Sequence, residues 1–348
     1  MIDMQALPEK INRWLANKHS DPQKIISLQT ANGGYSNITL MGELQSSHAP
    51  DSMGIVVRIQ PEGAAVFPDC DVQAQYQTMR LLGLAGLPVP GLLGLEMDSD
   101  IVGAPFFIMH RIEGSVPNEN PLYHLEGWFH DLPPAEIKQC WFSGIEGIAK
   151  LARLNWQDAG FDFLQPPNGQ TALDHQIQYY KNMLNWSEQL SGNQYELLWR
   201  CLNWLNANKP TSDTLSLSWG DAKLGNCVFK AGQLTGMLDW ERPALSNPVD
   251  DLSWWLMLDE SLCTGYGVPR LAHLPSREQS IEHWERVSGF SAKDLPYYDV
   301  FSAWRFAIIM TRIGKIFTER GWVPAQAEMD LRNGGSRLLE LLDERLHF

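Results

Sequence analysis

The chain lacks the cysteine pattern of a disulfide-bonded or zinc-binding protein. Its 348 residues include five cysteines, an odd number. They are widely spaced, at Cys70, Cys140, Cys201, Cys227 and Cys263. No two of them form the C-x-x-C pair that zinc sites and redox motifs use. We therefore expect reduced thiols and a cytoplasmic protein.

Long hydrophobic runs are also missing. The nearest candidate, FSAWRFAIIM, is interrupted by Arg305 and is much shorter than the ~20 residues that span a bilayer. The first residues, MIDMQALPEKINRWL, show no basic stretch followed by an apolar one, so no signal peptide is expected. The sequence predicts neither a membrane span nor a membrane partner.

Positive charge is scarce as well. The chain has 27 Lys and Arg against 41 Asp and Glu, which gives a formal net charge of −14. Proteins that bind the phosphate backbone of nucleic acids usually present a basic face, so nucleic acid is not expected as the main partner. Metal-type histidine spacing, a P-loop and a G-x-S-x-G elbow are absent too, which argues against those enzyme classes.

What is present is enough chain for two domains or lobes. Residues 24–112 read as strand, glycine turn, strand, strand, helix, strand, strand, which predicts a small, mostly antiparallel sheet with one helix at 71–84. After Gly114 the patterns are mainly helical, with a β insert at 215–240. The expected fold class is therefore α+β, with lobes at residues 1–111 and 112–348.

The β insert contains the most suggestive spacing, in W-G-D-A-K-L-G-N at residues 219–226. Asp221 and Asn226 bracket a loop, and Asp239 ends the second strand of the following hairpin. One Asp can accept a hydroxyl proton, while an Asn and a second Asp suit Mg²⁺, which prefers oxygen ligands. Kinase catalytic loops have this D-x-x-x-x-N spacing. The same spacing also occurs in turns whose polar residues are incidental.

Combined with the order of the elements, this stretch resembles the aminoglycoside phosphotransferase and choline kinase superfamily. The segment SLSWGDAKLGNCVFKAGQLTGMLDWERPALSNPVDDLSWW is similar to the H-G-D-x-x-x-x-N, I-D-W-E and D-P-x-x-D-L motifs of that superfamily. Other segments, among them GGYSNITLMGEL and YYDVFSAWRFAIIMTRIGK, look like the branch that also occurs fused to acyl-CoA dehydrogenases. The resemblance covers roughly residues 20–320 and implies a bilobal protein kinase-like fold, with a β-rich N-lobe and a larger helical C-lobe.

The resemblance implies a kinase that uses ATP and Mg²⁺ and phosphorylates a hydroxyl group of a small molecule. Asp221 would be the catalytic base, Asn226 and Asp239 would hold the Mg²⁺, and Asp251 would brace the catalytic loop. Nucleotide contacts would fall on the loop residues Gly33, Gly34, Ser36 and Asn37 and on the hinge residues Met109, His110, Arg111 and Ile112. Whether ATP or GTP is the donor stays open.

A kinase also needs a cation that binds the phosphates of the nucleotide, which is usually a lysine on the third strand. Between residues 25 and 149 the only lysine is Lys138, which lies past the hinge. Arg58 therefore stands where kinases have the β3 lysine, and Gln75 stands where they have its glutamate partner. A guanidinium still binds phosphate, and a neutral amide can orient it. Lys223 is either a second phosphate contact or a solvated surface lysine.

The residue before Gly-Asp, usually His in the family, is Trp219 here. An indole N–H can donate one hydrogen bond and accepts none. Either Trp219 replaces the packing of that histidine and catalysis is retained, or the chain is a pseudokinase-like protein that binds nucleotide and small molecules. Trp254, Trp255 and Trp284 fall on helical stretches, which favours core packing over a substrate groove. The acceptor stays open among hydroxy acids or hydroxyacyl compounds, amino alcohols and aminoglycosides.

Overall fold

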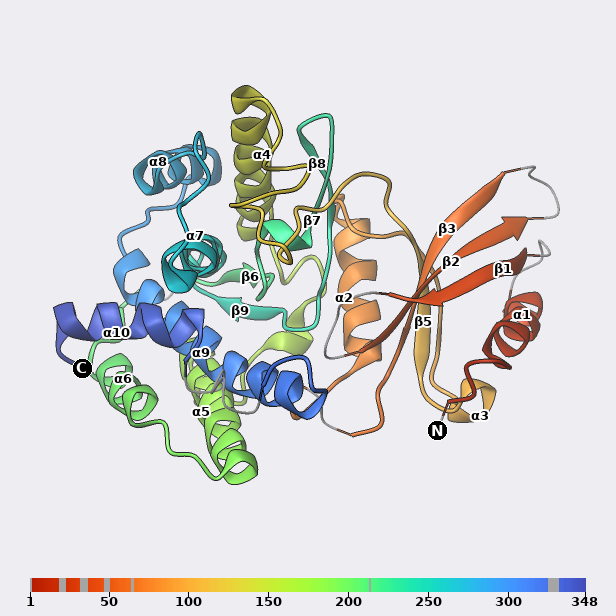
Figure 1. Cartoon of the computed structure of the whole chain (residues 1–348), viewed down its shortest axis with the longest axis horizontal. Helices are drawn as coiled ribbons and strands as arrows, with labels where there is room; N and C mark the ends of the chain where they lie inside the picture. Colours follow the sequence, from red (N-terminus) through yellow and green to blue (C-terminus); the bar gives the residue numbers. More distant parts are fainter. Residues whose placement is uncertain are drawn as a thin grey trace. The chain divides into compact units, whose positions relative to one another are not determined.

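The structure is a computed structural model, and it describes residues 2–18, 23–31, 37–46, 51–63, 66–212, 214–324 and 332–348. The chain divides into two compact units, which we call the N-terminal unit (Met1–Glu113) and the C-terminal unit (Gly114–Phe348). Sheet and helix are combined in the first, and the second is mostly helical (Figure 1). The predicted lobe boundary after residue 111 stays a prediction.

The N-terminal unit is built on a five-stranded sheet. In chain order it contains α1 (Leu7–Lys18), β1 (Gln23–Thr30), β2 (Ile38–Ser46), β3 (Ser52–Ile59), α2 (Val72–Leu84), β4 (Leu92–Glu96), α3 (Ser99–Val102) and β5 (Phe106–His110). The strand order is β1-β2-β3-β5-β4, and all neighbouring strands are antiparallel. The predicted antiparallel sheet with one long helix is confirmed, while the short helix α3 was not predicted.

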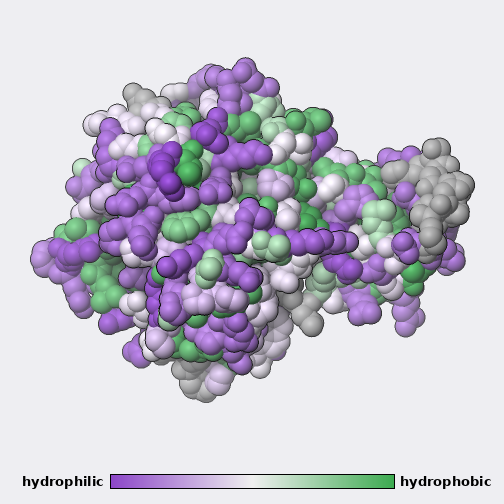
Figure 2. Space-filling view, turned by 90° about the horizontal axis from the view of Figure 1, so that it is seen from above, coloured by the Kyte–Doolittle hydropathy of each residue, from purple (hydrophilic) through white to green (hydrophobic). Residues whose placement is uncertain are grey.

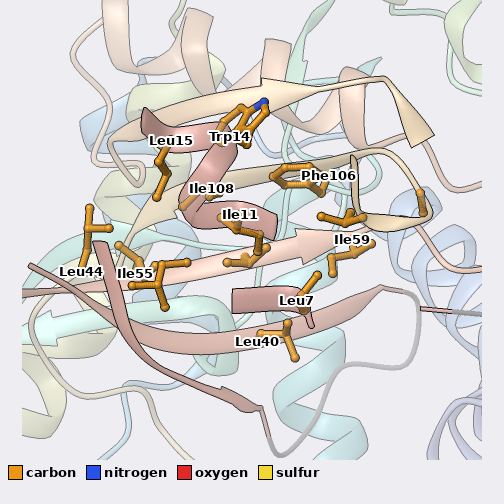
Figure 3. Close-up of a cluster of buried hydrophobic side chains, with 14 residues drawn as sticks. Leu7, Ile11, Trp14, Leu15, Leu40, Leu44, Ile55, Ile59, Phe106 and Ile108 are labelled. Atoms are coloured by element: carbon orange, nitrogen blue, oxygen red, sulfur yellow. The ribbon is translucent and has the colours of Figure 1, made fainter. Parts of the chain in front are cut away.

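Alternation along β3 gives the sheet two different faces. Ile55 and Val57 are fully buried and lie in one hydrophobic cluster with α1 residues such as Ile11 (Figure 3). Successive strand side chains point to opposite faces, so Arg58 lies on the other face, where its Nη1 donates to Gln75 Oε1 of α2 at 3.3 Å. The strand thus presents a cation on the face that α2 covers.

Helix α2 was predicted correctly in its extent and wrongly at one position. Helical spacing in the sequence predicts Val72, Tyr76, Met79 and Leu82 as core residues, and of these Val72, Met79 and Leu82 are buried. Tyr76 is only half-buried, whereas Gln75 is 3% exposed. Positions 72, 75, 79 and 82 follow the spacing of one helix face. The face that packs on the sheet therefore includes a polar side chain, whose amide is satisfied there.

The C-terminal unit consists of helices around two small β-pairs. In chain order it contains α4 (Pro134–Ala152), η1 (Asp162–Leu164), α5 (Ala172–Ser191), α6 (Glu196–Ala207), β6 (Ser216–Ser218), η2 (Leu224–Asn226), β7 (Cys227–Lys230), β8 (Gln233–Met237), β9 (Ala244–Ser246), α7 (Asp250–Cys263), η3 (Thr264–Tyr266), α8 (Arg277–Ser288), α9 (Leu295–Glu319) and α10 (Gly334–Leu346). Strand β6 pairs with β9, and β7 pairs with β8. The long helix α9 contacts α5, α6, α7 and α10 (Figure 1).

The β7–β8 hairpin turns at Ala231-Gly232, as the sequence predicted. Both turn residues have positive φ, 50° and 75°. Two central residues with positive φ are typical of the type I′ turn, whose twist matches that of the flanking strands. The turn thus fixes the position at which β8 ends, and with it the position of Asp239 two residues further on.

Tryptophan is used mainly for packing. Six tryptophans rank among the largest fully buried side chains, namely Trp141, Trp219, Trp240, Trp255, Trp284 and Trp304. The surface is different, because hydrophobic residues lie scattered among hydrophilic ones on the face shown in Figure 2. In the part of the chain that the structure describes, no helix is both long and apolar enough to cross a membrane.

Candidate active site

The residues predicted for chemistry in the C-terminal unit meet at the ends of short strands. Strand β6 ends at Ser218, and the following loop runs through Asp221 to Asn226, the last residue of η2. The N–H of Leu238 donates to the Asn226 carbonyl at 2.8 Å, so the residue before Asp239 is fastened beside Asn226. The hairpin therefore brings Asp221, Asn226 and Asp239 to one region.

Both carboxylate oxygens of Asp221 are oriented by N–H donors. Trp254 Nε1 donates to Oδ1 at 2.9 Å, and Asn226 Nδ2 donates to Oδ2 at 2.7 Å. The ammonium of Lys223 lies 3.9 Å from Oδ2, which is too far for a hydrogen bond. The side chain still keeps 32% of its surface exposed. The carboxylate is thus held rigidly without being closed off.

The surroundings of Asp221 raise its pKa, so that it binds a proton more readily than an ordinary Asp does. Burial raises the pKa of Asp221, and the carboxylates of Asp239 and Glu119 act in the same direction, while Lys223 lowers it. A raised pKa improves a carboxylate as a general base, provided that it is still ionised at the working pH. The environment therefore suits proton acceptance from a hydroxyl group.

Asn226 and Asp239 are suited to a divalent cation. Asn226 Nδ2 donates to both Asp221 O, at 3.0 Å, and Asp221 Oδ2, so the amide oxygen is the atom that Asn226 can offer. Asp239 has φ 61°, a conformation uncommon outside glycine and often found at functional sites. Among the described residues, at this site or at any other, no three His, Cys, Asp or Glu are placed to hold a metal. Magnesium at phosphates uses few protein ligands, and these two oxygens fit that requirement.

Lys223 is mostly buried and ion-paired. Its Nζ lies 2.9 Å from Glu119 Oε2, and 21% of its side chain is exposed. Burial alone would lower the pKa of Lys223, but the carboxylates of Glu119 and Asp221 outweigh burial and raise it. The residue therefore stays charged, and its burial does not fit a solvated surface lysine.

Trp219 packs beneath the segment that carries Asp239. The side chain is fully buried, and its ring stacks on Trp240 with centroids 5.3 Å apart. Its indole N–H donates to the carbonyl of Leu238 at 2.8 Å. Because Leu238 directly precedes Asp239, the tryptophan supports the backbone that positions this carboxylate.

Asp251 braces the start of the catalytic loop, as the resemblance implied. Its carboxylate accepts hydrogen bonds from the Ser218 hydroxyl at 2.8 Å, the Trp219 N–H at 2.7 Å and the Gly220 N–H at 3.1 Å. Burial, with Asp250 adding to it, raises the pKa of Asp251 to about 6, although these three donors lower it. One side chain on α7 therefore fixes three consecutive residues before Asp221.

In the N-terminal unit, three of the predicted nucleotide residues belong to one polar chain. Arg58 bonds to Gln75, and Gln75 Nε2 lies 4.0 Å from the Cys70 sulfur. The Cys70 thiol in turn donates to Asn37 Oδ1 at 3.0 Å. The neutral amide thus orients the guanidinium as expected. The predicted loop residues Gly33, Gly34 and Ser36 lie outside the described residues.

The hinge residues are partly engaged within their own unit. The predicted set is Met109, His110, Arg111 and Ile112, of which the first two end β5. The His110 N–H donates to Gly91 O at 2.7 Å, and the Arg111 N–H donates to Gly54 O at 2.8 Å. The Arg111 guanidinium also pairs with Glu43 at 2.8 Å. Contact with a base would therefore use the other backbone groups of this segment.

Sequence reasoning missed three residues that contact the predicted site. Trp254 was interpreted as core; it is buried, but its indole also holds Asp221. Positions 251 and 254 are three apart on α7, and such residues share a helix face, so the spacing could have revealed it. Glu119 and Cys70 lie in loops, where no periodic signal exists.

Comparison with known sequences agrees with this geometry. The model of the Phosphotransferase enzyme family matches residues 41–290. Acyl-CoA dehydrogenase family member 11 from Rattus norvegicus is 25% identical over 318 residues, which cover 88% of this chain and 38% of that protein. Acyl-CoA dehydrogenase family member 10 from Mus musculus is 23% identical over 255 residues, covering 73% of this chain and 22% of that protein. The chain spans well under half the length of these relatives.

Solved structures share the fold. A protein of Ralstonia eutropha, provisionally named an aminoglycoside phosphotransferase, superposes with a TM-score of 0.71 at 22% identity, covering 98% of this chain and 96% of that one. Aminoglycoside phosphotransferase APH(4)-Ia, in a ternary complex with ADP and hygromycin B, gives a TM-score of 0.57 at 14% identity, covering 96% and 98%. The predicted protein kinase-like fold is confirmed.

Proposed function

The chain belongs to the phosphotransferase enzyme family, and on this basis we propose that it is a nucleotide- and Mg²⁺-dependent kinase acting on a hydroxyl group of a small molecule. The observation that carries the proposal is the Asp221 carboxylate, which two N–H donors orient. It sits on a loop that Asp251 braces, next to the oxygen ligands of Asn226 and Asp239.

In the proposed reaction Asp221 accepts the proton of the acceptor hydroxyl as the oxygen attacks the terminal phosphate, and the bond from that phosphorus to the bridging oxygen breaks so that the nucleoside diphosphate leaves. Trp254 and Asn226 keep both carboxylate oxygens in place during that step. Phosphoryl transfer demands mainly positioning and charge neutralisation from the protein. A bound Mg²⁺, held by Asn226 and Asp239, would neutralise charge on the phosphate oxygens.

The proposed donor is a purine nucleotide. Structures that share the fold are complexes with ADP and with GDP, which supports either ATP or GTP here. Arg58, oriented by Gln75, is the proposed cation on the phosphates in the N-terminal unit, and Lys223 is the proposed second one. None of the five cysteines forms a disulfide, and the proposed location is the cytoplasm.

A cavity in the C-terminal unit offers a place for the acceptor. It encloses about 170 Å³ and is bounded by the first half of α5, residues 163–165, residues 242–245 and Arg305. A side chain at Gly220 would collide with the Arg242 carbonyl, so this wall touches the residue just before Asp221. Arg305 lies 4.8 Å from the ring of Trp254, whose indole holds Asp221. The cavity and the base thus share their supporting residues.

The lining of this cavity favours an acceptor that carries an anionic group. Two arginines and His175 line it, and no Asp or Glu among the described residues does. The Arg305 guanidinium pairs with Asp250 at 2.6 Å, and the Arg242 guanidinium lies 4.1 Å over the Tyr179 ring. Such a lining suits a hydroxy acid better than a polycationic aminoglycoside or an amino alcohol.

The alternative is a binding protein with weakened catalysis. One observation favours it: the side chain that orients Arg58 is the neutral Gln75, at the position where kinases have a glutamate. An assay of nucleotide consumption separates the two, using hydroxy acids, choline and aminoglycosides as acceptors with both ATP and GTP. We expect turnover with hydroxy acids, and a KM for them that Arg242→Gln raises about tenfold, or ~1.4 kcal/mol.

The other outcomes of this assay are equally informative. Turnover only with aminoglycosides or choline would overturn the anionic acceptor. No turnover with any acceptor, together with a nucleotide-induced rise in melting temperature, would support the binding protein instead.

A further inference from the structure

Glu119, in the loop before α4, contacts Lys223 of the catalytic loop. Glu119 Oε2 accepts a hydrogen bond from Lys223 Nζ at 2.9 Å, whereas the same ammonium lies 3.9 Å from Asp221 Oδ2. Lys223 thus has two carboxylates within reach and bonds directly to only one of them. Glu119 competes with the proposed base for the same cation.

Gly225 of the catalytic loop lies directly against the carboxylate of Glu119. A Cβ placed on this glycine would collide with Glu119 Oε1. No left-handed φ explains the glycine, because its φ is not among the positive ones. The glycine directly before Asn226 therefore leaves room for the carboxylate of Glu119 in its present position.

The second carboxylate oxygen of Glu119 makes no hydrogen bond within the described part of the chain that would stabilise the fold. Oε1 is buried and has no hydrogen-bond partner among the described residues. A small cavity lined by Glu119, Tyr123, Lys223 and Asp259 adjoins it. Leaving a buried acceptor unsatisfied costs roughly 1–3 kcal/mol, which offsets part of the stability gained from the pair with Lys223. A buried unsatisfied group in a native structure calls for a functional explanation.

We propose that Glu119 is a positioning residue for phosphoryl transfer, which holds Lys223 away from the Asp221 carboxylate. This inference rests on the proposed kinase function. Without the Glu119 charge, the nearest anion for Lys223 is Asp221. A direct pair would cover Oδ2, one of the two oxygens that can accept the acceptor proton. Glu119 thereby keeps the base open and leaves the ammonium beside it for the transferring phosphate.

The test is a double-mutant cycle with Glu119→Gln and Lys223→Met. Glu119→Gln alone is expected to lower kcat by about 10- to 100-fold and to change the KM for nucleotide less than about twofold, because Lys223 then occupies Asp221. In the Lys223→Met background the same change is expected to have almost no effect, since no ammonium remains to block the base. An additive loss in that background would mean a purely structural role and would overturn the proposal.

Two further variants serve as controls. Glu126→Gln removes an exposed glutamate of the same loop and is expected to leave kcat unchanged. Glu119→Asp keeps the charge and is expected to restore part of the kcat lost in Glu119→Gln. No recovery with Asp, or an equal loss in Glu126→Gln, would contradict the proposal.

A crystal structure of Glu119→Gln tests the inference separately from catalysis. We expect Lys223 Nζ to move into direct hydrogen-bond distance of Asp221 Oδ2. An ammonium that stays 3.9 Å away, as in the unmodified chain, would refute the positioning role even if the kinase activity is real. A wild-type protein without transfer to any acceptor would instead refute the proposed function.

Discussion

Trp219 stands at the head of the catalytic loop, where the family usually has His, and its contacts explain how the loop keeps its shape. The ring stacks on Trp240, and the indole N–H reaches the carbonyl of Leu238, next to Asp239. The contact needs only a donor, so the inability of an indole to accept a hydrogen bond costs nothing here. The geometry therefore agrees with a substitution that preserves the site.

Replacing Trp219 by Phe tests this support. The variant keeps an aromatic ring but leaves the buried Leu238 carbonyl without its donor, so the free energy of unfolding should fall by roughly 1–3 kcal/mol beyond the loss of ring volume. Trp284→Phe is the matched control, since Trp284 is also fully buried while its indole N–H has no partner among the described residues. Chemical denaturation measures both, and equal losses would show that the hydrogen bond contributes little.

The raised pKa of Asp251 predicts that the stability of the protein depends on pH. Its folded-state pKa is raised to about 6, against an ordinary Asp value of about 3.9, so the folded protein binds this proton more tightly than the unfolded chain does. The stabilising contribution is therefore complete below pH ~4 and is lost as the pH rises through about 6. Asp251→Asn cannot titrate and serves as the reference.

The measurement is denaturant unfolding of both proteins across this range. Relative to Asp251→Asn, the wild type should lose up to roughly 3 kcal/mol of unfolding free energy between pH ~4 and pH ~7. A difference that stays constant, or that grows with pH, would mean that the three donors on Asp251 dominate over its burial.

Among the elements, the turn between β6 and Asp221 depends on a glycine. Gly220 has φ +86°, and a Cβ there would collide with the backbone carbonyl of Arg242. Gly289, at the end of α8, has a similar φ of +76° but open space around it. An alanine at either position would be strained by the positive φ, but only at Gly220 would its Cβ also collide with another atom.

Substituting alanine at each position separates these effects. Gly289→Ala should cost about 1 kcal/mol of unfolding free energy, the usual penalty for a positive φ. Gly220→Ala should cost more than about 3 kcal/mol, because the obstructing atom is backbone and cannot rotate away. Urea midpoints measure both, and similar midpoints would show that the segment at Arg242 yields easily.

The elements differ in how far the sequence predicts them. Periodicity and the Ala231-Gly232 turn were sufficient for the long helices and the β7–β8 hairpin. Strand β9 spans only Ala244–Ser246, which is too short for alternation to be recognised. Likewise, the pairing of Glu119 with Lys223 joins positions 104 residues apart, and no local pattern encodes such a contact.

At the scale of the whole molecule, the family and the order of elements were predictable because several motifs occur in the expected sequence order. The acceptor was not, because the cavity draws on α5, residues 242–245 and α9, which only the fold assembles. The curated relatives are named acyl-CoA dehydrogenase family members, and these proteins are more than twice as long as the region that matches this chain.

The central claim is that Asp221 carries the transfer of a phosphoryl group to a hydroxyl. Phosphorylated product formed by wild type and by Asp221→Asn, measured by mass spectrometry at saturating nucleotide and hydroxy acid, tests it most directly. Asparagine keeps the size of the side chain but cannot take up the proton, so we expect product formation to fall by about 10²- to 10⁴-fold, while nucleotide still raises the melting temperature of the variant. Product formation by Asp221→Asn at the wild-type rate would contradict the account.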